Sequence, residues 1–211
     1  MDEDLKMSLL KQFDEELDSE QKPVIPDSQI ELNTDETVIE DDSNLPENKK
    51  YTDILKKYFG YSSFRKPQLN IIKKTIEEKR DQLVVMATGR GKSLCYQFPA
   101  LYFKSGVTVV ISPLISLMED QVMSLALLNV EACLLGSAQN SNSKAEEDIL
   151  NGRYKVLFIT PEYIDSTPDF LLKTNEKVKI NLLAIDECHC VSQWGDFFLL
   201  SVNFFLMNKL N

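Results

Sequence analysis

The sequence predicts an α/β domain in which helices cover both faces of a parallel β-sheet. Three observations lead to this fold class. Short apolar runs of strand length alternate with longer segments whose apolar residues recur at helical spacing. The runs are almost continuously apolar, which is typical of strands that are buried on both faces. Polar motifs follow several of these runs, at the places where open α/β sheets bind their ligands.

The expected elements begin after residue 48 and follow one another in alternation. Helical periodicity predicts helices at 51–59, 68–78, 93–101, 114–127, 144–150 and 163–173. Short apolar runs predict strands at 82–86, 107–111, 130–134, 156–160 and 180–186. We expect functional side chains beyond the carboxyl ends of these strands.

Charge divides the 211 residues into two parts. Residues 1–48 hold 16 of the 33 Asp and Glu residues but 3 of the 23 Lys and Arg residues, a balance of −13, whereas the remainder carries +3. A stretch so acidic and so poor in aromatic residues cannot bury enough apolar surface to offset its ordering entropy. We therefore expect a disordered acidic leader at 1–48. Residues 5–17 have near-helical apolar spacing and would form either a transient helix or a helix that binds a protein partner.

Several classes of protein are disfavoured. Cys95, Cys133, Cys188 and Cys190 fit neither a zinc knuckle nor the disulfide framework of a small secreted domain, so free thiols are expected. The acidic N-terminus lacks the features of a signal peptide. No window approaches the roughly 18 continuous apolar residues of a membrane span. We expect a soluble intracellular protein with no membrane contact.

A candidate phosphate-binding loop, residues 87–93, lies between a predicted strand and a predicted helix. Its glycines would let backbone N–H groups face phosphate oxygens, and the helix N-terminus would add its dipole. The Lys92 ammonium would face the β- and γ-phosphates, and the Ser93 hydroxyl would ligate Mg²⁺. Met86 stands where the usual pattern has its first glycine, but the core of the motif is intact. The expected ATP contacts are Thr88, Gly89, Arg90, Gly91, Lys92 and Ser93.

A pair of acids follows the last predicted strand. Asp186 would hold Mg²⁺ through water, and Glu187 would orient and polarise the attacking water. The alternative is that two acids at a strand end are solvated or cap the next helix. His189 adjoins the pair and would link the ATP site to the rest of the protein. Cys188 and Cys190 are expected to pack rather than to bind a metal, because further ligands are lacking.

Together these motifs resemble those of the RecQ helicases of superfamily 2. Residues 186–189 resemble the D-E-x-H box, and residues 190–195 resemble its continuation in this family. Residues 58–68 resemble the adenine-recognition motif. The resemblance implies that Tyr61 stacks on adenine, that Arg65 lies beside it and that Gln68 reads the base edge. A side-chain amide can donate and accept at once, which suits the paired edge of adenine.

The same resemblance implies contacts with DNA. Residues 111–121 resemble motif Ia, and residues 160–162 occupy the place of a motif that touches the DNA backbone. A transition from loop to helix offers free N–H groups to phosphate. The implied DNA-binding residues are Ser112, Pro113, Thr160, Pro161, Glu162 and Trp194.

The resemblance implies a RecA-like first lobe at 49–195 of an ATP-dependent 3′–5′ DNA helicase. ATP and Mg²⁺ are its implied cofactors, single-stranded or forked DNA its partner, and the nucleus its location. Residues 196–211 depart from the family pattern, so we expect an incomplete lobe with a C-terminal tail of its own. Without the arginine finger of a second lobe, worth about 10³ to 10⁵ in rate, ATP would hydrolyse slowly. The alternative is a non-catalytic fragment that binds nucleotide and DNA. A third possibility, a metabolic P-loop kinase, would leave residues 64–68 and the D-E-x-H box at 186–189 unexplained.

Overall fold

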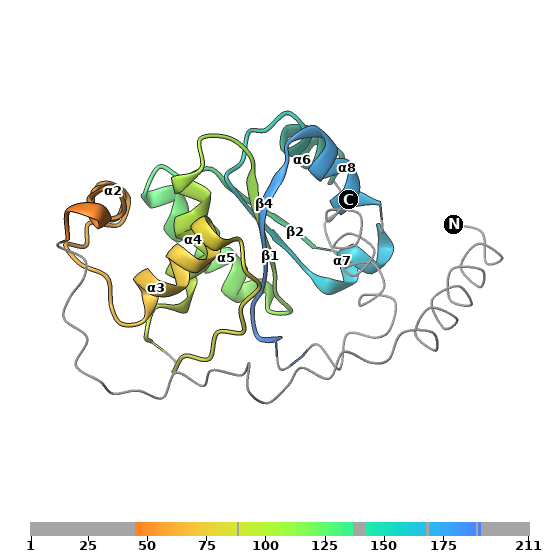
Figure 1. Ribbon diagram of the computed structural model, residues 1–211. Helices are drawn as coiled ribbons and strands as arrows, with labels where there is room; N and C mark the ends of the chain where they lie inside the picture. The colour runs from red at the N-terminus through yellow and green to blue at the C-terminus, as the bar shows by residue number, and fades with distance from the viewer. Residues whose placement is uncertain (1–44, 88, 137–141, 168, 189, 191–211) are drawn as a thin grey trace, which may run out of the picture. The chain divides into compact units, whose positions relative to one another are not determined.

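The computed structural model describes residues 45–87, 89–136, 142–167, 169–188 and 190. A four-stranded parallel sheet lies at its centre, in the strand order β2-β3-β1-β4. Helices lie on both sides of this sheet (Figure 1), which confirms the predicted α/β class. The strands are β1 (Val107–Ile111), β2 (Ala132–Leu135), β3 (Val156–Ile159) and β4 (Ile180–Ile185).

The helices form three groups around the sheet. Helices α4 and α5 cover one face, and α6, α7 and α8 cover the other (Figure 1). Helices α2 and α3 pack outside α4. The two expected helices at 51–59 and 68–78 are present, each ending in a π-helical turn, Leu55–Phe59 (η4) and Lys74–Glu78 (η5). The helices are α2 (Lys49–Ile54), α3 (Gln68–Lys73), α4 (Lys92–Tyr102), α5 (Ile115–Leu127), α6 (Asn142–Leu150), α7 (Pro161–Ser166) and α8 (Phe170–Lys177).

The central strand β1 explains why the sheet is covered on both faces. All five of its residues are buried. Side chains alternate along a strand, so Val109 and Ile111 join the core beneath α6, α7 and α8, whereas Val110 joins the core beneath α4 and α5. Two apolar faces in one strand require two helical layers.

Three strands end level with one another. Ile111 of β1 is aligned with Ile159 of β3 and with Ile185 of β4. The residues that follow are joined by backbone hydrogen bonds, from Ser112 N to Ile159 O over 3.1 Å and from Asp186 N to Ile111 O over 2.8 Å. The motifs that follow these strands in the sequence therefore meet at one edge of the sheet.

The predicted strand at 82–86 is wrong. Residues 81–87 form neither helix nor strand, and the side chains of Leu83 and Val85 are 78% and 84% exposed. A strand is stabilised by hydrogen bonds to a neighbouring strand, and none of the four described strands pairs with this run. The run is held instead through Gln82, whose Nε2 donates to Ile71 O over 3.1 Å and to Thr75 Oγ1 over 2.8 Å.

The single helix predicted at 163–173 is two helices, α7 and α8. The break falls at Thr167, whose N–H and hydroxyl both donate to Tyr163 O, over 3.0 and 2.6 Å. The next residue in the sequence is Pro168, and a proline removes a helical donor and disfavours the helical conformation of the residue before it.

Most of the expected leader and tail lies outside the described residues. Of the leader, only residues 45–48 are described, and Pro46–Asn48 form a short 3₁₀ turn that leads into α2. The amphipathic segment at 5–17 and the tail at 196–211 are not described. The four cysteines are free thiols, and burial raises the pKa of Cys95 to about 11. Cys188 is exposed, so the expectation that it packs is wrong. None of the described helices is both long and apolar enough to span a membrane.

Candidate nucleotide site

The phosphate-loop residues lead directly into α4. Gly89 and Gly91 have φ values of 78° and 83°, in the left-handed region that glycine enters without strain. Helix α4 begins at Lys92, and the first N–H groups of a helix have no partners within it. The half-buried Lys92 and Ser93 side chains therefore stand beside a set of N–H donors and the positive end of a helix dipole. This arrangement can bind a phosphate group.

Arg65 and Gln68 donate hydrogen bonds to backbone carbonyl groups of the phosphate loop. Arg65 Nη1 donates to Gly89 O over 2.8 Å, and Gln68 Nε2 donates to Gly91 O over 3.0 Å. The other half of the Gln68 amide, Oε1, accepts from Arg65 N over 2.8 Å. Gln68 is 3% exposed, and a Cβ placed on Gly91 would lie 2.5 Å from its Nε2. The Gln68 amide is thus engaged with backbone on both sides, and it would read a base after these bonds open.

Tyr61 remains available for the predicted stacking on adenine. It follows Gly60, which has a φ of 72° and ends the π-helical turn η4. Its ring is exposed, and it lies four positions before Arg65 in the segment that contacts the phosphate loop. An exposed aromatic ring can take up a flat apolar base.

Replacing Gln68 with alanine should reduce the preference for ATP over GTP about fivefold to tenfold, because the amide would no longer distinguish the two base edges. The net contribution of a hydrogen bond is about 1 kcal/mol, which sets this scale. Competition binding of the two nucleotides would measure the ratio. Gln82→Ala is the matched control, since the Gln82 amide donates to Ile71 of α3 and to Thr75 of η5, neither of which belongs to the phosphate loop. An unchanged ratio in Gln68→Ala would contradict the assigned role.

The acid pair lies at the end of β4. The Asp186 carboxylate accepts two hydrogen bonds, to Oδ1 from Glu187 N over 3.0 Å and to Oδ2 from the Tyr96 hydroxyl over 3.2 Å. Glu187 has a φ of 53°, a left-handed backbone that is costly for a residue with a side chain. Such conformations persist where the surrounding structure imposes them and cluster at functional sites. Two hydrogen bonds thus hold the Asp186 carboxylate, so it is not merely solvated; the alternative that it caps the turn that follows stays open.

Tyr96 links helix α4, which carries Ser93, to Asp186. Its phenol donates to Asp186, and it lies one turn after Ser93 on α4. Hydroxyl and carboxylate oxygens are the ligands that Mg²⁺ prefers, so the donor set fits the ion. Burial and then the negative charge of Asp186 raise the pKa of Tyr96, which keeps its hydroxyl a donor. Sequence reasoning missed Tyr96, although its position three residues after Ser93 on a helix places both on one face.

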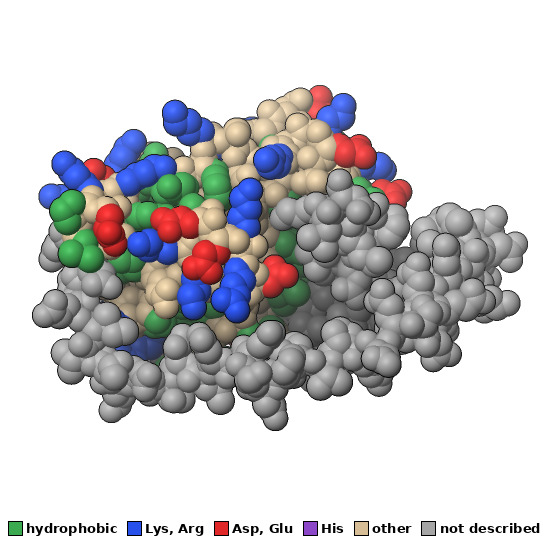
Figure 2. Space-filling view, in the orientation of Figure 1, with side chains coloured by type: hydrophobic (Ala, Val, Ile, Leu, Met, Phe, Trp, Pro, Cys, Tyr) green, Lys and Arg blue, Asp and Glu red, His purple; other side chains and the backbone are tan. Residues whose placement is uncertain are grey.

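Several of the predicted DNA-binding residues are buried and cannot contact DNA with their side chains as they stand. Ser112 is buried, and its hydroxyl has no hydrogen-bond partner among the described residues. Thr160 is buried and caps α7, because its Oγ1 accepts from Tyr163 N over 3.2 Å. Pro161, at the first position of α7, is buried and has no N–H, whereas Glu162 is exposed in the same turn. The face seen in Figure 2 carries Lys and Arg with Asp and Glu among them, so its charge is mixed.

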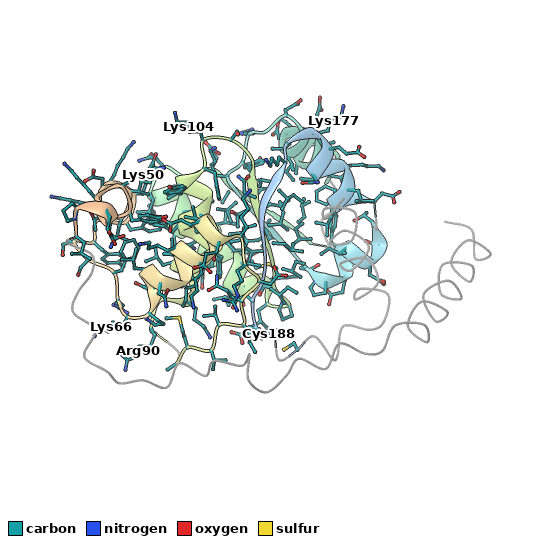
Figure 3. The ribbon with its side chains drawn as sticks, in the orientation of Figure 1. Lys50, Lys66, Arg90, Lys104, Lys177 and Cys188 are labelled. Atoms are coloured by element: carbon teal, nitrogen blue, oxygen red, sulfur yellow. The ribbon has the colours of Figure 1, made fainter. Side chains whose placement is uncertain are left out.

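The site lies at one end of the fold. Figure 3 shows Arg90 of the phosphate loop and Cys188, next to the acid pair, at the same end, and Lys104 and Lys177 at the other. Lys104 and Lys177 precede β1 and β4, so the candidate site stands at the carboxyl ends of the strands, as predicted for this fold class. The predicted Thr88, His189 and Trp194 lie outside the described residues.

Comparison with known proteins gives consistent matches. The DEAD/DEAH box helicase family matches residues 65–200. The bifunctional 3′-5′ exonuclease/ATP-dependent helicase WRN of Mus musculus is 44% identical over 93% of this chain and 15% of its own length. The ATP-dependent DNA helicase RecQ of Pasteurella multocida is 44% identical over 79% of the chain and 26% of its own length. The chain thus spans about a quarter or less of these relatives.

The motifs and the comparisons agree. Residues 58–60 and 135–139 resemble the Werner-syndrome helicase in particular, in keeping with the identity to the mouse protein. The parallel sheet, with its phosphate loop and acid pair, is that of a RecA-like helicase lobe. The chain belongs to the DEAD/DEAH box helicases and, within them, to the RecQ helicases.

Proposed function

We propose that this chain supplies the first, ATP- and DNA-binding lobe of an ATP-dependent 3′–5′ DNA helicase, with the lobe at residues 49–195. The observation that carries the proposal is the hydrogen bond from the Tyr96 hydroxyl to Asp186 Oδ2 over 3.2 Å, which ties α4, the helix that begins at Lys92, to the acid pair at the end of β4. Hydroxyl and carboxylate oxygens suited to Mg²⁺, with a lysine ammonium at the start of a helix, form a site for a nucleoside triphosphate.

Each residue of the site would have a distinct task. Lys92 would place its ammonium against the β- and γ-phosphates, and Ser93 and Asp186 would hold Mg²⁺, with Asp186 acting through water. A bound Mg²⁺ would neutralise the phosphate charge that develops during hydrolysis. Glu187 would orient the attacking water and accept its proton.

A DNA substrate is the second part of the proposal. The relatives named as DNA helicases support it, as do the level strand ends that set the two candidate DNA motifs beside the nucleotide site. We propose single-stranded or forked DNA as the substrate. Relatives in mouse and Arabidopsis thaliana support a role in the nucleus.

The alternative function is binding of nucleotide and DNA without catalysis. The experiment that separates the two is a DNA-stimulated ATPase assay on purified residues 1–211. DNA-dependent turnover would support the helicase lobe as a working ATPase. Binding of ATP without turnover, with and without DNA, would support the binding function. The family assignment removes the metabolic kinase from consideration.

Glu187→Gln should leave the affinity for Mg-ATP within about threefold of that of the wild type and lower any ATP turnover by about 10² to 10⁴. The substitution removes the capacity to accept a proton but changes the volume of the side chain little. Equilibrium titration with a fluorescent ATP analogue and a phosphate-release assay would measure the two quantities. Glu176→Gln, the same change at an exposed acid on α8, serves as the control. Collapse of nucleotide binding would instead make Glu187 a structural residue.

A further inference from the structure

Tyr96 connects the interior of the domain with the candidate metal site. Its ring is buried in the core between α4 and the sheet, with Ala100, Val110 and Met118. Its hydroxyl reaches the carboxyl end of the sheet and donates to Asp186 Oδ2 over 3.2 Å. The ring is therefore fixed by packing, and the position of the hydroxyl is fixed with it.

The hydroxyl links two elements that approach the site separately, because Tyr96 belongs to α4 and Asp186 follows β4. Ser93 lies in the first turn of α4, one turn before Tyr96 on the same face of the helix. The hydrogen bond therefore fixes Asp186 relative to the turn that carries Ser93. The second oxygen of Asp186 is held by Glu187 N over 3.0 Å. Rotation of the carboxylate is thus opposed at both oxygens.

A phenol is a suitable hydrogen-bond donor to a carboxylate that must also bind a cation. A lysine or arginine in this position would neutralise the charge that Mg²⁺ requires, whereas a phenol orients the carboxylate and leaves its charge in place. A carboxylate oxygen has two lone pairs, so each oxygen of Asp186 can accept a hydrogen bond and still face water or an ion.

We propose that Tyr96 is a positioning residue of the magnesium site, one that holds Ser93 and Asp186 in the mutual orientation that Mg²⁺ binding requires. The inference rests on the proposed function, because it presupposes a Mg-nucleotide at this site. Residues that hydrogen-bond to metal ligands orient those ligands, and the removal of such a hydrogen bond commonly lowers metal affinity about 10-fold to 100-fold. Because Glu187 N still holds one oxygen, we expect the lower end of this range.

Tyr96→Phe tests the proposal on the full chain, because it removes the hydroxyl and keeps the ring. A fluorescent ATP analogue is titrated at a series of Mg²⁺ concentrations and in excess EDTA. The Mg²⁺ concentration for half-maximal stimulation of binding should rise about tenfold, whereas the affinity measured in EDTA should stay unchanged. Tyr102→Phe, which makes the same change on the same helix but stacks on Tyr51, should behave as wild type.

A double-mutant cycle separates positioning from a general structural effect. If Tyr96 acts through Asp186, then Tyr96→Phe should have no further effect on Mg²⁺ dependence in the Asp186→Asn background. Independent, additive effects would overturn the proposal. So would an unchanged Mg²⁺ dependence in Tyr96→Phe, or an equal loss of affinity with and without Mg²⁺. A wild-type chain that binds nucleotide without any Mg²⁺ dependence would overturn the proposed function as well.

A measurement on the wild-type chain keeps the test independent of how the variant folds. With ¹³C-labelled tyrosine, the Cζ resonance of Tyr96 should shift when Mg²⁺ is added to the nucleotide-bound protein, because the hydrogen bond to Asp186 changes as the ion binds. The shift should disappear in Asp186→Asn. Absence of any shift in a wild-type chain that binds Mg-nucleotide would overturn the positioning role and leave the proposed function standing.

Discussion

Lys92→Ala should weaken the binding of Mg-ATP by at least about 100-fold and thereby abolish any ATP turnover at micromolar nucleotide. Charge-assisted hydrogen bonds contribute about 1.5–3 kcal/mol each, and a lysine that contacts both the β- and the γ-phosphate makes two of them. The half-buried side chain starts at the first residue of α4, where the helix dipole adds to its charge. Isothermal titration calorimetry with Mg-ATP and with Mg-ADP would measure the loss. The loss should be smaller for ADP, which lacks the γ-phosphate.

Lys104→Ala is the matched control for this experiment. Lys104 lies just before β1, at the opposite end of the sheet (Figure 3), and its side chain is exposed. Removing its charge alters the net charge of the protein by the same amount but leaves the candidate site intact. Equal losses in the two variants would show a general electrostatic effect. Unchanged binding in Lys92→Ala would refute the phosphate site.

Phe98→Ala should lower the free energy of unfolding by about 3–5 kcal/mol, the range for truncating a buried aromatic side chain. The Phe98 ring is 0% exposed. Its ring centroid lies 5.9 Å from that of Tyr51 and 5.4 Å from that of Phe64. It therefore fills the interface between α4 and the outer helices. Urea unfolding followed by circular dichroism would measure the change, and a loss below about 1 kcal/mol would contradict the packing.

The same substitution should also affect the nucleotide site. Phe64 precedes Arg65, which holds the phosphate loop through Gly89 O, so loosening the outer helices should weaken this contact. Met123→Ala is the control, because Met123 is 67% exposed on α5 and surface substitutions change stability by about 0.5 kcal/mol or less. A drop in stability as large for Met123→Ala as for Phe98→Ala would indicate an error in the assignment of the core.

The elements that could be predicted are those whose pattern is local. The strand at 107–111 and the helix that starts beside Lys92 depend on apolar spacing and on glycine, both visible in a short window. The run at 82–86 has the same apolar character, but strand formation depends on a neighbour. The described strands offer none, so pattern alone gave the wrong structure.

Contacts within the site follow the same division. The phosphate loop and the acid pair were predicted because each is contiguous in sequence. The Tyr96 hydrogen bond to Asp186 joins residues 90 positions apart, and the Gln68 hydrogen bond to Gly91 O joins residues 23 apart. Neither hydrogen bond produces a pattern that a short window of sequence would reveal. A tyrosine within a helical apolar pattern is interpreted as a core residue. The ring of Tyr96 does lie in the core, but its hydroxyl reaches the candidate site.

The level ends of β1, β3 and β4 make the candidate site depend on strand register. Neighbouring residues of a strand point to opposite faces and lie about 3.3 Å apart along it. A slip of β4 by one residue against β1 would therefore move Asp186 by that distance and turn its side chain toward α7 and α8, away from Tyr96. Correct assembly of the sheet and assembly of the metal site are the same event, so nucleotide binding can serve as a reporter of whether the strands have paired in register.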